Sequence, residues 1–171
     1  MTIHQYVDLS YQRTQLLTTY RQLSRKQQQV LQLTAVLYEP ISKAQLLSCW
    51  NRLHPIDSTY PKFTNSTFNP VFAALTAPGL IVAAPAHSYR CHPLLVEILT
   101  REAIDAETFE AMATAIAAQL PLTYLGPSKK IFFQGVEQFM RVARLGNLSA
   151  SVRSVAWVAR DAIDLFLHSV C

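Results

Sequence analysis

Two short stretches with the same polar pattern constrain the fold of this chain more than any other feature. Ser24 precedes Gln27 by three positions, and Ser42 precedes Gln45 by the same spacing. In this arrangement, a capping box, the serine side chain accepts a hydrogen bond from the amide of the glutamine. The glutamine side chain reaches back to the amide of the serine. Each pair therefore predicts the start of a helix.

Both predicted helices carry an apolar stripe and are stopped by a proline. The stripes consist of Val30, Leu31, Leu33 and Leu37 in the first segment and Leu46, Leu47, Trp50 and Leu53 in the second. Glu39-Pro40 ends the first helix and His54-Pro55 the second, because the residue before a proline is pushed out of the helical region. Since only a few residues connect the two helices, we expect a helix-turn-helix pair.

A third helix is predicted after a polar loop. Thr64, Asn65 or Ser66 is suited to cap it. A proline fits only the first turn of a helix, so Pro70 places the predicted start near Thr67. Its apolar positions are Phe68, Val71, Phe72 and Leu75.

The period of the apolar pattern changes after Gly79. Residues 80–84 predict a short strand, 85–88 a turn and 89–91 a returning strand, which together form a small β-hairpin. His92-Pro93 then opens a further helix, with proline at its first position.

Three short helices followed directly by a β-hairpin resemble a winged-helix domain over about residues 24–100. The stretch 75–81, Leu-Thr-Ala-Pro-Gly-Leu-Ile, carries the resemblance best. It looks like the end of a recognition helix that turns through glycine into the first wing strand. The likeness is one of topology and includes no specific motif. The alternative is a generic helical domain in which the apolar stretch is an incidental loop.

The resemblance implies contact with double-stranded DNA through the third helix, whose first residues enter the major groove. The residues expected in the groove are Lys62, Asn65, Ser66, Thr67 and Asn69, and those expected at the DNA backbone are Arg25, Lys43 and Arg90. Asparagine pairs with adenine through both ends of its amide, and cationic side chains neutralise phosphate. The third helix has no lysine or arginine between Ser66 and Pro78, so its own face is expected to bind weakly.

Helical patterns continue on both sides of this unit. Residues 9–22 predict an amphipathic helix ahead of it. Asp105 is expected to cap a helix over 106–120, and another helix is expected over 128–145 with Gly146 as its C-terminal cap.

The last predicted helix, from Asn147 onwards, is apolar nearly all the way round over 155–167. Such a helix needs cover on more than one side. Either it lies centrally in its own fold, or the natural protein continues past Cys171 and supplies the cover. The sequence thus predicts a mainly α protein: a winged-helix-like domain at 1–104 with one small β-hairpin, and a C-terminal helical bundle at 105–171.

The composition favours a protein that meets a partner in the cytoplasm. Half of the 171 residues are hydrophobic and 15% are charged, with a net charge of +4. That charge content is low against the ~25% typical of globular proteins, so we expect a partner or a larger assembly. The N-terminus lacks the apolar segment of a signal peptide, and no apolar run approaches the ~20 residues that span a membrane. Three cysteines, an odd number, are then free thiols in a reducing compartment.

Neither metal binding nor catalysis is expected. His87 and Cys91 have a spacing that zinc permits, but a structural site needs four converging ligands. Cys91 and His92 are adjacent, and neighbours on a strand point to opposite faces, so they do not form a nucleophile–base pair. Four glycines leave no glycine-rich phosphate loop. We therefore expect no enzyme and no cofactor, with a small cysteine hydrolase as a distant alternative.

The closer alternative to DNA binding is a non-enzymatic protein-interaction module. Five alanines between residues 111 and 118 permit close approach of another helix. In that interpretation the apolar C-terminal helices contact a partner protein or the remainder of a longer chain.

Overall fold

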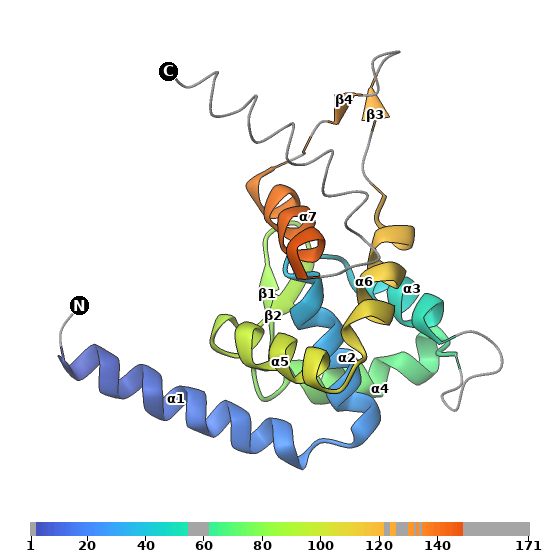
Figure 1. The fold of residues 1–171 in the computed structure, drawn as a ribbon. Helices are drawn as coiled ribbons and strands as arrows, with labels where there is room; N and C mark the ends of the chain where they lie inside the picture. The colour runs from blue at the N-terminus through green and yellow to red at the C-terminus, as the bar shows by residue number, and fades with distance from the viewer. Residues whose placement is uncertain are drawn as a thin grey trace, which may run out of the picture.

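The computed structural model describes residues 3–54, 62–121, 124–125, 130–131, 133 and 135–148. It is mainly α, as the sequence predicts, and the described residues form two small antiparallel hairpins where the sequence predicts one (Figure 1). The elements are α1 (Ile3–Gln22), α2 (Arg25–Leu37), α3 (Lys43–Leu53), α4 (Asn65–Thr76), β1 (Ile81–Ala84), β2 (Ser88–Cys91), α5 (Pro93–Asp105), α6 (Phe109–Gln119), β3 (Tyr124–Leu125), β4 (Lys130–Ile131) and α7 (Val136–Leu148).

Helix α2 is the central element of the core. It packs most extensively against α5, while α3 packs against α6. Seven of its thirteen residues are buried. Helix α1 begins at Ile3, six residues earlier than predicted, and it extends away from the body with only its last turns covered (Figure 1).

The two predicted capping boxes are confirmed. The Ser24 amide donates to Gln27 Oε1 at 2.9 Å, and the Gln27 amide donates to Ser24 Oγ at 3.4 Å. The same pair of bonds joins Ser42 and Gln45 at 2.9 and 3.2 Å. These caps satisfy amides that have no partner inside the helix, which fixes where α2 and α3 begin.

Helix α4 begins at Asn65 with Thr64 as its cap, so the predicted start at Thr67 is wrong. Pro70 lies in the sixth position of the helix rather than in its first turn. A proline there deprives the carbonyl of Ser66 of its usual donor. Ser66 and Pro70 are both exposed, so water is available to that carbonyl in place of the missing amide.

The predicted hairpin is confirmed and gains a third chain segment. β1 and β2 pair antiparallel, from Ile81 opposite Cys91 to Ala84 opposite Ser88. Ile41, in the connection between α2 and α3, exchanges two hydrogen bonds with Tyr89 at 3.0 and 2.8 Å. The connection is thereby tied to the outer edge of the hairpin.

The predicted start of the helix after Asp105 is wrong. Asp105 is the last residue of α5, and α6 begins at Phe109 after an uncapped Thr108. The reason is a Schellman turn centred on Glu107, whose φ is 57°. In this turn the Thr108 amide donates to the carbonyl of Ala103 at 2.9 Å. Glycine is the usual residue in that conformation. Because glutamate occupies it here, the sequence does not indicate the turn.

The helix predicted over 128–145 is α7, shifted and shortened to Val136–Leu148, because Lys130–Ile131 forms β4. Gly146 is an interior residue of α7 and not its cap. Asn147 and Leu148, assigned to the next predicted helix, belong to α7 as well. The rest of that helix lies outside the described residues.

Candidate nucleic-acid interface

The first half of α4 presents its polar side chains to solvent. Phe68, Phe72 and Leu75 point inward and are buried. The exposed side of the helix carries Asn65, Ser66, Thr67, Asn69, Pro70 and Ala73. The four helix residues predicted for the DNA groove thus lie together on one exposed surface, and Lys62 just ahead of them is exposed as well.

A row of aromatic rings fixes α4 on the body. Ring centroids follow one another at 5.2 Å from Trp50 to Phe63, at 5.3 Å from Phe63 to Phe68 and at 5.9 Å from Phe68 to Phe72. Tyr89 of β2 meets Phe72 edge-on at 4.9 Å. Rings at these separations attract one another beyond their apolar burial. The row therefore holds α3, α4 and the hairpin in one arrangement.

The segment that leads into α4 is held by Asn51 of α3. Its Nδ2 donates to the carbonyl of Phe63, and its Oδ1 accepts from the amide of Phe63, both at 2.9 Å. An amide side chain that bonds both groups of one residue imitates a strand partner. These two bonds fix the backbone of Phe63, the residue directly after Lys62.

Two lysines from the neighbouring helices lie near α4 and the segment that leads into it. The ammonium of Lys26 in α2 lies 4.6 Å from the centroid of Phe63. That of Lys43 in α3 lies 5.3 Å from the centroid of Phe72 and donates to Asn69 Oδ1. Sequence analysis singled out Lys43 and Asn69 separately but missed their contact, because they are 26 residues apart. Of the adjacent cations Arg25 and Lys26, it is Lys26 whose ammonium lies on the ring of Phe63, just ahead of α4.

Arg90, also predicted at the DNA backbone, is on the other face of the hairpin. Its neighbour Tyr89 faces α4, and successive strand residues point to opposite sides. The Arg90 guanidinium lies 3.8 Å from Glu137 of α7. Arg25 is exposed at the start of α2, and no contact of the described residues ties it to α4. The structure thus brings Lys43 to the predicted groove residues and leaves Arg90 apart from them.

Charge is distributed unevenly along the chain. The segment 9–96 has eight basic residues, namely Arg13, Arg21, Arg25, Lys26, Lys43, Arg52, Lys62 and Arg90. Its two acidic residues are Glu39 and Asp57, and Asp57 lies outside the described part. Glu39 is 3.1 Å from Arg141, a buried partner. The next carboxylates come from α5 onwards. Within the part of the chain that the structure describes, α2, α3 and α4 therefore carry an excess of positive charge.

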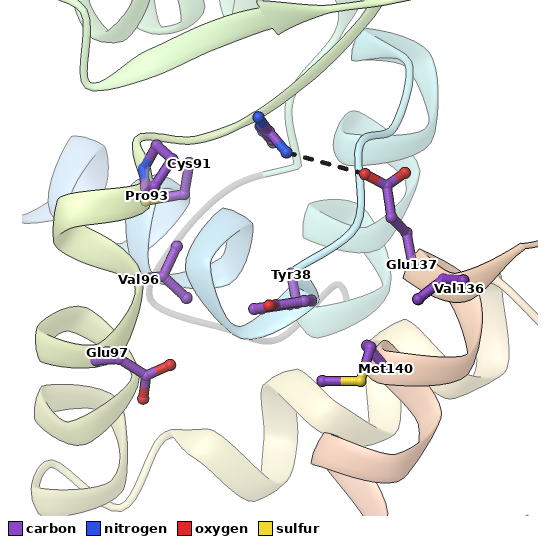
Figure 2. A pocket seen from close by; sticks show the side chains of 9 residues that line it. Tyr38, Cys91, Pro93, Val96, Glu97, Val136, Glu137 and Met140 are labelled. Atoms are coloured by element: carbon purple, nitrogen blue, oxygen red, sulfur yellow. Dashed lines mark ion pairs between the residues drawn. The ribbon is translucent and has the colours of Figure 1, made fainter.

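A separate cavity of about 280 Å³ lies between β2, α5 and α7. Figure 2 shows Tyr38, Val96 and Met140 around it, with the ion pair of Glu137 at its edge. Tyr38 has φ 68° and ψ −42°, and the Glu39 amide donates to the Leu37 carbonyl at 2.8 Å. This is a γ-turn of the rare, strained kind. Sequence analysis interpreted this stretch only as a helix stop and missed the cavity.

The two cysteines of the described residues are both buried. Burial raises the pKa of Cys49 and of Cys91 to about 12, so both thiols stay protonated at neutral pH. Burial lowers the pKa of His54 and of His92. In the part of the chain that the structure describes, no three potential metal ligands gather. No helix in that part has the length and apolar character to cross a bilayer.

No protein-family model, curated protein or solved structure matches this chain. The geometry of the surface on α4 is therefore the basis for a functional proposal.

Proposed function

We propose that this chain binds double-stranded DNA as a winged-helix domain does, with the first half of α4 in the major groove and the β1–β2 hairpin beside it. The observation that carries the proposal is the exposed polar side of α4, with Lys43 bonded to its Asn69 and Lys26 on the ring of Phe63 just ahead of the helix. Polar side chains on a fixed helix suit base edges, and the flanking cations suit phosphates.

The order of elements supports the same proposal. The bridge between Ile41 and Tyr89 inserts a one-residue strand between α2 and α3. The resulting order is helix, strand, helix, helix and hairpin, with the segment between the first two helices paired to the returning hairpin strand. This order supports the proposal, in which α4 corresponds to the recognition helix of a winged-helix domain.

The proposal predicts weak binding that depends strongly on salt. Three cations surround the exposed side of α4 or precede it: Lys26, Lys43 and Lys62. Each neutralised phosphate adds about −0.9 to the slope of log K against log salt, so a slope of roughly −3 is expected. Tight binding without a second module is not expected, because α4 carries no cation of its own.

The test is fluorescence anisotropy of a labelled random-sequence duplex across a salt series. The variant K26Q/K62Q should weaken binding and reduce the magnitude of the slope by about 2. The matched control is R13Q/R101Q, which removes two exposed cations outside this surface, one on α1 and one on α5, and should leave the slope unchanged. Binding that is absent, insensitive to salt or equally impaired in the control would contradict the proposal.

A protein-interaction module is the second candidate, because α7 leaves apolar side chains uncovered. Val136 is 77% exposed, Met140 41% and Leu148 43%. Covering exposed apolar surface of this kind with a partner lowers the free energy of the complex. Static light scattering at increasing concentration tests self-association. V136K/M140K should abolish it if α7 is the contact and leave DNA binding intact.

A further inference from the structure

Lys43 and Asn69 meet across the junction of α3 and α4. Lys43 is the first residue of α3, and Asn69 lies in the second turn of α4. The ammonium of Lys43 donates to Oδ1 of Asn69. An ammonium has donors and no acceptor, so this contact fixes which end of the amide faces the lysine. Asn69 is exposed, and its Nδ2 is the end that remains for a ligand.

This contact changes what Asn69 offers to DNA. To read adenine, asparagine uses both ends of its amide, Oδ1 as acceptor and Nδ2 as donor. With Oδ1 already bonded to the Lys43 ammonium, the free end of the amide is Nδ2, which donates. The ammonium of Lys43 also only donates, so the free groups of the two side chains together match a group that accepts hydrogen bonds.

The Lys43 ammonium is held in place by an aromatic ring of the core. The Lys43 ammonium lies on the ring of Phe72, which is 7% exposed and is fixed by the edge of Tyr89. In the described part of 9–96 the one carboxylate is Glu39, which pairs with Arg141. A cation held by its own protein loses less entropy when a ligand arrives.

We propose that Lys43 and Asn69 form a clamp for one phosphate of the DNA backbone, so that Asn69 positions α4 and does not read a base. The inference rests on the proposed function and specifies the partner group of this part of the surface. A phosphate oxygen accepts from both side chains and its charge matches the ammonium. Base reading is then left to Asn65, Ser66 and Thr67.

The test compares two labelled duplexes, one of A·T pairs alone and one of G·C pairs alone. N69A should weaken binding to both by the same factor, about fivefold for one lost phosphate contact. N69D should weaken both further, because its carboxylate still accepts from Lys43 but has no donor for the phosphate and repels it. Circular dichroism melting checks that these exposed substitutions leave the fold intact.

A double-mutant cycle tests whether the two side chains act together. K43Q should reduce the magnitude of the salt slope by about 1 on both duplexes. K43Q/N69A should lose less than the product of the two single losses, because each side chain acts through the same phosphate. The matched control Arg52→Gln removes an exposed cation of the same helix α3 and should show no coupling to N69A.

The outcomes separate this inference from the proposed function. Loss confined to the A·T duplex in N69A would show that Asn69 reads adenine and would overturn the clamp while DNA binding stands. Losses of K43Q and N69A that multiply would also overturn it. Failure of the unaltered protein to bind either duplex would remove the proposed function and the clamp together.

Discussion

Arg141 joins α7 to the rest of the molecule through a buried ion pair with Glu39. Its side chain is 2% exposed, lies 3.1 Å from Glu39 and donates to the Leu120 carbonyl at 3.0 Å. Removing one partner of a buried ion pair leaves the other uncompensated. The pair therefore makes the position of α7 depend on the connection after α2.

Substituting Glu39 tests this dependence. E39A should lower the free energy of unfolding by about 3 kcal/mol, because the guanidinium of Arg141 stays buried without its counter-ion. R101A, at an exposed arginine of α5, is the control and should change stability by less than about 0.5 kcal/mol. Urea denaturation measures both. A small effect of E39A would mean that Arg141 finds another partner or solvent.

His54 makes stability depend on pH. It is 9% exposed, stacks at 4.2 Å on Trp50, and burial lowers its pKa from the usual 6.5. The unfolded chain therefore binds the proton more readily than the folded chain. The contribution of neutral His54 to stability is present above pH 6.5 and is lost as pH falls through the lowered pKa.

Urea midpoints measured downward from pH 7.5 should therefore decrease below about pH 6.5. H54F, which keeps a ring against Trp50 and cannot be protonated, should flatten part of that decrease. His92 has a lowered pKa for the same reason and accounts for a further part, so H54F/H92F is the complementary variant. An unchanged slope in both variants would assign the pH dependence to other groups.

At the scale of elements, Pro70 is the clearest local cost in α4. It sits in the sixth position of the helix, with the side chains at positions 66 and 70 both exposed. P70A restores a donor for the Ser66 carbonyl and replaces the poorest helix former with the best. Stability should rise by about 1 kcal/mol, read from urea denaturation. A fall in stability would show that the proline ring makes a contact that alanine cannot replace.

The element boundaries show what sequence patterns determine and what they leave open. Ser24 and Ser42 were sufficient to place two helix starts, because a capping box depends on residues three apart. The turn at Glu107 could not be predicted, because glutamate rarely adopts the left-handed backbone conformation found there. The contact of Lys43 with Asn69 was equally invisible, because it requires the packing of α3 on α4.

At the scale of the whole molecule, one hydrophobic cluster runs through the described residues, from Leu16 in α1 to Leu145 in α7. The mainly α class followed from helical periodicity and few glycines. The distribution of charge over space did not, since it depends on which surfaces α2, α3 and α4 leave open. The winged-helix interpretation and its DNA partner remain proposals that this arrangement supports.

The most direct test of the central claim is a titration of isotope-labelled protein with a short duplex, followed by amide chemical shifts. Binding through the first half of α4 predicts the largest shift changes at residues 62–69 and around Lys43, with α7 unaffected. Changes confined to α7 and the edge of the cavity at Tyr38, with none in 62–69, would contradict it.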